Sequence, residues 1–338
     1  MIAELAEKVK AGKNLSREET RNAFDEIMSG KVETEEIKEL LIALRDKGET
    51  VDEISGAAES MRAVVAKVET DLGCPLLDVV GTGGDNKSTI NVSTTAAIVA
   101  AGAGCYVAKH GNRSVSSKCG SADVLEHLGV NISTTPEKNA ELIKKIGIAF
   151  LFAPVHHPTM KYAIQARKEI GTRTIFNILG PITNPAGAQT YMLGAFSLEL
   201  AEKLAGVLAA LETEHALVVY GNDGFDELSI SAPSTVFEVR KGEIEKYEVS
   251  PEKFGFPLGK EEEVQAETIE DNAEAMMAIL KGEEKGSRLN MVLMNAGAAI
   301  YANGLVESFE EGIAEAKKSI ELGKALEKLE KLIEESNK

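Results

Sequence analysis

Short apolar runs alternate with helical stretches from residue 76 onward, and this alternation constrains the fold more than any other feature of the sequence. The runs are bounded by Gly, Pro or polar residues, and they cover residues 76–80, 105–108, 148–152, 191–196 and 216–220. Apolar strands separated by helices are typical of a buried, mostly parallel sheet with helices on both faces. Residues 234–248 predict a hairpin at the edge of that sheet, with Lys241-Gly242 as its turn. The sequence therefore predicts an α/β fold with a central sheet flanked by helices.

The first 70 residues, by contrast, predict helices only. Ser16 and Thr50 each precede a glutamate by three residues, which is the spacing of a helix capping box, and Thr34 predicts a third helix start. Apolar residues recur at helical spacing between these signals, and no β-rich run interrupts them. We therefore expect a small all-helical domain over residues 1–72 and a large α/β domain over residues 73–338.

Charge and cysteine content exclude several classes of protein. The 338 residues carry 37 Lys and Arg against 54 Asp and Glu, a net charge of −17, so we expect neither nucleic acid nor an anionic membrane as a partner. Cys74, Cys105 and Cys119 lack CxxC spacing and predict neither a disulfide framework nor a zinc site. The first residues contain acids and lack the apolar segment of a signal peptide, and no apolar stretch approaches the roughly 20 residues of a membrane span. We therefore expect a cytoplasmic protein.

Two long windows of the chain are almost free of acidic residues. Residues 86–122 contain none, and residues 155–196 contain only Glu169. In so acidic a chain, gaps that retain Lys, Arg, Asn and Ser predict a cleft that binds anions. The alternative is that both windows are buried core, which fits the apolar stretch 96–108 but not the polar residues beside it.

A glycine turn follows the first predicted strand. The sequence DVVGTGGD spans residues 78–85, and NVSTT at 91–95 opens an alanine-rich helix. Glycines let the backbone approach a ligand closely, and a helix start supplies N–H donors and the positive end of the helix dipole. The turn lacks the Gly-Lys-Ser/Thr of a Walker loop and the third glycine of the dinucleotide fingerprint. It therefore predicts a phosphate site of another kind.

A second polar loop follows the next predicted strand. It reads KHGNRSVSSKCGSAD over residues 109–123, and eleven of these fifteen residues can donate a side-chain hydrogen bond or are glycine. Because parallel strands end at the same edge of a sheet, this loop and the glycine turn are expected at one edge.

These motifs together resemble those of the anthranilate phosphoribosyltransferases of tryptophan biosynthesis. The resemblance is carried by GTGGD at 81–85, NVSTT at 91–95, KHGNRSVSSKCGSAD at 109–123, RTIFN at 173–177, GPITNP at 180–185 and the pair Asp226-Glu227. It covers nearly the whole chain, with one mild departure at Phe225, where the family pattern has Leu. It implies that the amine of anthranilate attacks C1 of phosphoribosyl pyrophosphate (PRPP), with inversion and with Mg²⁺, and expels pyrophosphate.

The resemblance also implies the residues of the PRPP site. These are Gly81, Gly84, Asp85, Thr89, Asn91, Val92, Ser93, Thr94, Lys109, His110, Gly111, Asn112, Arg113, Ser114, Val115, Ser116, Ser117 and Ser121. Ser93, Asp226 and Glu227 would bind Mg²⁺, with two ions expected per site, because adjacent carboxylates suit a hard cation that also bridges substrate phosphates. Taken alone, Asp226-Glu227 also fits a solvated loop pair.

A further set of residues would bind anthranilate, namely Gly81, Asn112, Arg167, His110, His157 and Pro181. Arg167 offers a planar fork to the carboxylate, with a surface-helix arginine as the alternative. The two histidines either line the ring pocket, move a proton or only form structural hydrogen bonds, and Pro181 either walls the ring or fixes a turn. No residue is assigned as a catalytic acid or base, and charge stabilisation and positioning are attributed to Lys109, His110 and Arg113.

The resemblance finally implies an active site between two domains, with parts of residues 155–185 returning to the helical domain, and a homodimer formed through that domain. One alternative is a pyrimidine nucleoside phosphorylase of the same fold, which has less need of the Asp226-Glu227 pair. Another is a non-catalytic relative that binds nucleic acid, which the net charge and the intact motifs disfavour.

Overall fold

The computed structural model describes residues 1–85, 87–114 and 119–338. Its first part consists of α1 (Ile2–Lys10), α2 (Arg17–Met28), α3 (Thr34–Lys47) and α4 (Val51–Val64). The capping boxes predicted at Ser16 and Thr50 are confirmed, because each hydroxyl accepts from the N–H of the glutamate three residues later. The helix start predicted at Thr34 is also confirmed, although Thr34 is itself the first helical residue and Glu33 precedes the helix without a side-chain cap.

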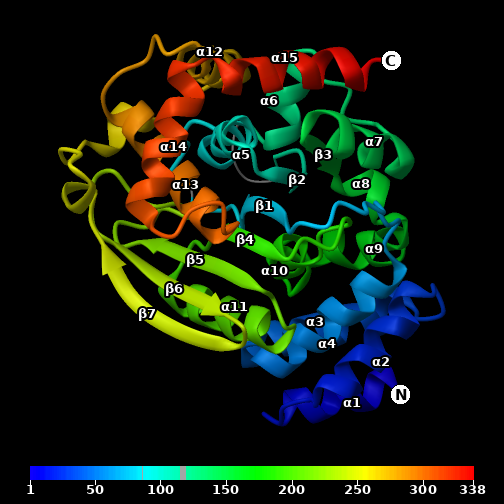
Figure 1. Cartoon of the computed structure of the whole chain (residues 1–338). Helices are drawn as coiled ribbons and strands as arrows, with labels where there is room; N and C mark the ends of the chain where they lie inside the picture. Colours follow the sequence, from blue (N-terminus) through cyan, green and yellow to red (C-terminus); the bar gives the residue numbers. More distant parts are fainter. Residues whose placement is uncertain (86, 115–118) are drawn as a thin grey trace.

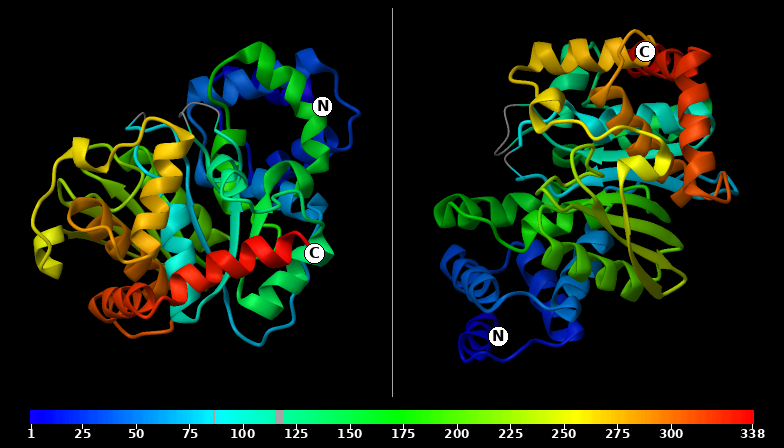
Figure 2. Two further views of the ribbon diagram at one scale, coloured as in Figure 1. Left: turned by 90° about the horizontal axis from the view of Figure 1, so that it is seen from above. Right: turned by 90° about the vertical axis from the view of Figure 1, so that its left-hand side faces the viewer.

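Two later segments pack against these N-terminal helices. Helix α9 (Lys161–Ile170) contacts α3 and α2, and α10 (Phe176–Leu179) contacts α4. The rings of Phe24 and Phe176 lie 5.4 Å apart and join α2 to α10. Figure 2 shows α9 beside the N-terminal helices in both views. The chain thus leaves the helical part after α4 and returns to it, although the exact domain limits stay a prediction.

A seven-stranded sheet forms the centre of the molecule, in the order β3-β2-β1-β4-β5-β6-β7. Its strands are β1 (Leu76–Gly81), β2 (Tyr106–Gly111), β3 (Ile148–Phe152), β4 (Thr190–Gly194), β5 (His215–Gly221), β6 (Ser234–Arg240) and β7 (Glu243–Val249). The pairs from β3 to β5 are parallel, and β6 and β7 pair antiparallel at the edge. The predicted fold class and the edge hairpin are confirmed.

Strand β2 extends past its predicted end at residue 108 to Gly111. The extra residues include Lys109 and His110, which are buried despite their polarity. Lys109 donates to the Val79 carbonyl oxygen of β1, so its side chain is hydrogen-bonded within the sheet. Because these two side chains are polar, the apolar pattern ended early and the end of the strand was predicted three residues short.

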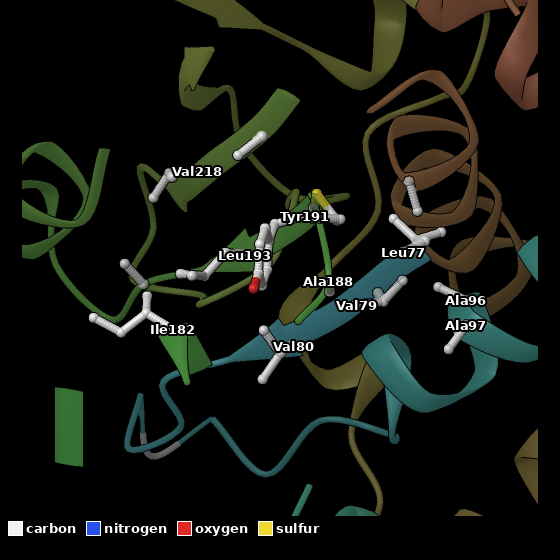
Figure 3. Close-up of a cluster of buried hydrophobic side chains, with 14 of the residues drawn as sticks. Leu77, Val79, Val80, Ala96, Ala97, Ile182, Ala188, Tyr191, Leu193 and Val218 are labelled. Atoms are coloured by element: carbon white, nitrogen blue, oxygen red, sulfur yellow. The ribbon is translucent and has the colours of Figure 1, made fainter. Parts of the chain in front are cut away.

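Helices cover both faces of the sheet (Figure 1). They are α5 (Val92–Ala103), α6 (Ser121–His127), α7 (Pro136–Ile146), α8 (Ala153–His156), α11 (Leu198–Ala210), α12 (Ile269–Leu280), α13 (Ser287–Ala302), α14 (Phe309–Glu321) and α15 (Lys324–Ser336). Helices α5 and α13 contact the central strands on one side, and α11 contacts β5 and β6 on the other. In Figure 3, Leu77 and Val79 point toward Ala96 and Ala97 of α5, whereas Val80 lies on the side of Ile182. Within the described residues, no helix is long and apolar enough to cross a bilayer.

The order of the strands reverses between β1 and β4, because β2 and β3 lie on one side of β1 and β4 to β7 on the other. In open α/β sheets, ligands bind beyond the carboxyl ends of the strands at such a point. Gly81 and Gly194 end these two strands as neighbours. A Cβ at Gly81 would lie 2.7 Å from Asp226 Oδ2, and a Cβ at Gly194 only 1.5 Å from the Asp226 carbonyl oxygen. The two glycines thus make room for the segment that carries Asp226 at the switch point.

Candidate active site

The glycine turn and Asp226 meet at this edge. Gly83 and Gly84 have φ of 66° and 82°, a conformation that glycine adopts without strain. The Gly83 N–H donates to Asp226 Oδ2 at 2.7 Å. A carboxyl oxygen thus lies on an N–H group of the turn that was predicted to bind phosphate, so this turn can accept an acidic oxygen.

Three carboxylates crowd together here. Asp226 and Glu227 are only 8% and 9% exposed, and Asp85 is close enough to act on both. Burial and the neighbouring Asp85 raise the pKa of Asp226, and burial and the neighbouring Asp226 raise the pKa of Glu227 well above its usual range. In the described part of the chain, Asp85 Oδ2 has no hydrogen-bond partner. Carboxylates this close together repel one another, and a bound cation would relieve that repulsion.

These residues fit magnesium in a particular way. No group of three or more His, Cys, Asp or Glu side chains among the described residues could hold a metal ion alone. Magnesium, however, keeps several waters and uses one or two carboxylates together with substrate phosphates. The crowded, partly unsatisfied carboxylates of Asp85, Asp226 and Glu227 match that requirement once a phosphate is present.

The start of α5 completes this half of the site. The Ser93 backbone N–H is close enough to the Glu227 carboxylate to act on its pKa, so Ser93 lies beside the predicted metal ligands. Asn91 precedes the helix, and its amide donates to Asn272 Oδ1 of α12 at 3.1 Å. Val92 and Thr94 are buried, while Thr89 bridges to Gln265. The backbone of Ser93 lies near Glu227, whereas Asn91 and Thr89 contact the carboxyl-terminal part of the chain.

Lys109 connects the carboxylates to the interior of the sheet. Its ammonium donates to the Val79 carbonyl at 2.7 Å and is close enough to Asp78 and Glu227 for both carboxylates to act on its pKa. Burial lowers the pKa of Lys109, while those two carboxylates act in the opposite direction. Burial likewise raises the pKa of Asp78 to about 7. The Lys109 side chain is thus buried and close enough to Glu227 to interact with its carboxylate.

His110, the next residue of β2, belongs to a different environment. Its Nδ1 lies 3.0 Å from the Gly180 carbonyl oxygen, which can only accept, so Nδ1 carries the proton and Nε2 the lone pair. Its ring centroid lies 5.1 Å from that of His157. Burial lowers the pKa of His110 strongly and that of His157 to about 4, so both rings are neutral. Their Nε2 atoms are buried without a partner in the described chain, and the buried Pro181 follows Gly180.

The loop after β2 turns toward α6. Arg113 pairs with Asp123 and Glu126 at 3.0 and 2.8 Å and lies over the Phe152 ring. Ser121 Oγ donates to the Asn112 carbonyl, and a Cβ at Gly111 would clash with that Ser121 oxygen. The Ser114 N–H donates to Asp123. Arg113 therefore forms its ion pairs with α6 and not with Asp226 or Glu227. The predictions for Val115, Ser116 and Ser117 lie outside the described residues.

Arg167 lies on α9, with its guanidinium 5.5 Å from the centroid of the Phe176 ring. Burial lowers the pKa of Arg167, and no carboxylate of the described chain lies at ion-pair distance from it. A half-buried arginine on an aromatic ring differs from a solvated surface arginine. The structure does not bring Arg167 into hydrogen-bond contact with His110 or His157.

Sequence reasoning gave no role to several residues that build this edge. Asp78 accepts from the His110 N–H at 3.1 Å and from the Asn184 amide at 2.7 Å, so it joins β1, β2 and the loop before β4. The sequence contained an indication of this role, because Asp78 is the only charged residue in the predicted apolar strand 76–80. The contacts of Gly194 and Arg173 could not be predicted from the sequence, although Arg173 opens the RTIFN motif, because their partners lie in distant parts of the chain.

Comparisons with known proteins identify related sequences and folds. A family model described as the a/b domain of a glycosyl transferase family matches residues 73–326, and another, described as the helical bundle domain, matches residues 3–65. The anthranilate phosphoribosyltransferase of Desulfosudis oleivorans is 48% identical over 334 residues, which cover 99% of this chain and 98% of that protein.

Two solved structures extend the likeness to three dimensions. Anthranilate phosphoribosyltransferase from Thermus thermophilus aligns with a TM-score of 0.93 at 42% identity over 99% of both chains. The enzyme from Saccharomyces cerevisiae in complex with PRPP and Mg aligns with a TM-score of 0.91 at 28% identity, over 99% of this chain and 98% of that chain. The same yeast enzyme has been solved with 4-fluoroanthranilate. By sequence, fold and the arrangement of this edge, the chain belongs to the anthranilate phosphoribosyltransferases.

Proposed function

We propose that this chain transfers the phosphoribosyl group of PRPP to the amine of anthranilate, with inversion at C1 and dependence on magnesium. One observation carries the proposal. Consecutive residues of β2 face two unlike environments, Lys109 toward buried carboxylates and His110 toward a neutral histidine. A sugar diphosphate and an aromatic amine need such surroundings side by side. The yeast relative, solved with PRPP and Mg and with 4-fluoroanthranilate, supports the same pair of ligands.

The carboxylate half would bind the sugar diphosphate. Asp226, Glu227 and the Ser93 hydroxyl would hold magnesium, with two ions per site, and the metal would neutralise charge on the departing diphosphate. The Gly83 N–H and the N–H groups that open α5 would orient the phosphates. Lys109 would add fixed positive charge where negative charge develops, a form of stabilisation that needs no movement during the reaction.

The histidine half would bind anthranilate. In the reaction the C1–N bond forms as the C1–O bond breaks, and the electron pair of that bond leaves on the diphosphate. The arylamine becomes acidic as its nitrogen bonds to carbon, so even a weakly basic imidazole can accept its proton. His110 Nε2 carries an unshared lone pair and can receive that hydrogen. Arg167 would bind the carboxylate, and Pro181 would lie against the ring.

We further propose a homodimer formed through the helical domain, which comprises residues 1–72 and parts of 155–185. Support comes from Tyr162 and Ile164 of α9, which are 39% and 42% exposed although they are large and apolar. Light scattering after gel filtration measures the mass directly. We expect a dimer for the wild type and a monomer for Ile164→Glu.

The activity is tested by following the fluorescence of anthranilate with PRPP and magnesium, omitting each component in turn. Consumption of anthranilate that requires all three components is the expected result. No consumption, together with cleavage of thymidine or uridine by phosphate, would favour the pyrimidine nucleoside phosphorylase alternative instead.

A further inference from the structure

Arg173 lies between α9 and α10 and reaches across to the glycine turn of the large domain. Its Nη2 donates to the Gly84 carbonyl oxygen at 2.5 Å. Its guanidinium carbon lies 3.8 Å from the centroid of the Phe196 ring, just after β4. One side chain thus touches both loops that follow β1 and β4, the two strands of the switch point.

The partners of Arg173 leave its charge uncompensated. Arg17 and Arg45 each pair with a carboxylate, but no carboxylate in residues 1–85, 87–114 or 119–338 lies within ion-pair distance of Arg173. Its contacts are a neutral carbonyl and an aromatic face. A guanidinium forms stronger, forked hydrogen bonds with phosphate than with a carbonyl. The chemistry of the side chain therefore favours an anion at this position.

Gly84 shows how closely the guanidinium lies on the turn. A Cβ at Gly84 would be 1.8 Å from Arg173 Nη2 and 2.7 Å from its Cζ. On the same turn, the Gly83 N–H already receives a carboxylate oxygen from Asp226. The turn thus accepts an anionic oxygen while a cation lies over its next residue, which are the two halves of a phosphate site.

We propose that Arg173 binds the diphosphate of PRPP, exchanging the Gly84 carbonyl for phosphate oxygens when the sugar substrate occupies the turn. This inference rests on the proposed function and adds a residue to its sugar-phosphate half. Arg173 follows Arg167 by six residues on the segment that packs against the helical part. Binding of the diphosphate therefore also fixes the segment that carries the proposed anthranilate-binding arginine.

The test measures the binding of pyrophosphate with Mg²⁺, of ribose 5-phosphate and of PRPP with Mg²⁺ by isothermal titration calorimetry. For Arg173→Ala we expect a dissociation constant at least tenfold higher for pyrophosphate and PRPP, with ribose 5-phosphate changed less than twofold. Arg45→Ala is the matched control, because Arg45 donates to Thr172 of the same segment at 2.7 Å without touching the turn. It should leave all three constants within twofold.

Two outcomes would overturn the proposal. One is a change of less than threefold for pyrophosphate in Arg173→Ala, and the other is an equal loss in Arg173→Ala and Arg45→Ala, which would indicate a structural role. If the alanine variant does not fold, Arg173→Lys decides, since lysine keeps the charge but not the fork, and unchanged pyrophosphate affinity would then count against the proposal. Failure of the proposed function shows itself differently, as wild-type protein that binds PRPP but does not consume anthranilate.

Discussion

The two halves of the site lie at one sheet edge and differ in their electrostatic character. On one side Asp85, Asp226 and Glu227 crowd together, and burial with mutual repulsion raises the pKa values of Asp226 and Glu227. On the other side His110 and His157 are buried as neutral rings. One half brings several acidic groups together, whereas the two histidines of the other half are uncharged.

This difference has a consequence for stability. A carboxyl group whose pKa is raised on folding stabilises the protein at low pH, and that contribution is lost as pH rises through the folded pKa. A histidine whose pKa is lowered favours folding at high pH, and that contribution is lost as pH falls below the unfolded value. The two halves therefore respond to pH in opposite directions, and each can be altered separately.

The largest effect is expected from Asp226→Asn combined with Glu227→Gln. Turnover should fall at least about 100-fold, or about 3 kcal/mol, because the charges that hold the metal and stabilise the departing diphosphate are removed. In metal-free buffer the same variant should unfold at a higher temperature than the wild type, since the crowding of like charges is relieved. Steady-state kinetics and thermal melting measure the two changes.

The control for this pair is Glu245→Gln on the exposed edge strand β7, which should change neither quantity. Magnesium should raise the melting temperature of the wild type and of this control, because a ligand that binds only the folded state stabilises it. An unchanged magnesium response in the double variant would show that these carboxylates are not metal ligands.

The histidine half is tested by His157→Gln. The pKa of His157 falls from its ordinary 6.5 to about 4, chiefly through burial and then through the neighbouring His156. This contribution is fully present above pH 6.5 and is lost as pH falls toward 4, by about 3 kcal/mol. Urea unfolding at pH 7.5 and pH 4.5 should therefore differ less in the variant than in the wild type.

Exposed His127 on α6 supplies the matched substitution, His127→Gln. It should leave the difference between the two pH values as it is in the wild type. Equal pH dependence in wild type and His157→Gln would mean that His157 is accessible to protons, and the contrast between the two halves would then fail.

The sequence predicted the sheet and the glycine turn because both depend on local patterns. Apolar runs separated by helices dictate a buried parallel sheet, and GTGGD dictates a turn that exposes backbone N–H groups. Asp226 was predicted to lie in the same site by resemblance, and the structure places it on the Gly83 N–H. Local signals thus predicted the sheet and its glycine turn, whereas the place of Asp226 beside that turn was predicted by resemblance alone.

Contacts between distant segments escaped prediction. Lys109 donates to a carbonyl inside the sheet, and Arg113 pairs with α6. From the sequence alone, both side chains could equally be exposed cations. The positions of Gly194 and Arg173 depend on chain segments more than thirty and almost ninety residues away. Such partners follow from strand order and helix packing, which residue spacing does not encode.

The carboxylate half also depends on the absence of a side chain at Gly194. A Cβ there would lie 1.5 Å from the Asp226 carbonyl oxygen, and backbone cannot move aside as a flexible side chain can. Gly194→Ala should lower the unfolding free energy by about 2 kcal/mol and weaken the magnesium response. Gly180→Ala is the control for stability, since its Cβ meets nothing within 4 Å and its φ is −49°. Equal unfolding free energies for the two variants would refute the packing argument.

The smallest expected effect separates the two substrates. Arg167→Ala should raise the KM for anthranilate about tenfold, or about 1.4 kcal/mol, while the KM for PRPP changes less than twofold. Arg167 lies over Phe176 without a carboxylate of the described chain at ion-pair distance, and its proposed partner is the anthranilate carboxylate. Arg167→Lys should recover only part of the loss, because lysine cannot bind a carboxylate with a planar fork, and exposed Lys168→Ala on the same helix should leave both constants unchanged. An equal rise in both KM values for Arg167→Ala would place this arginine between the two halves and end its assignment to one of them.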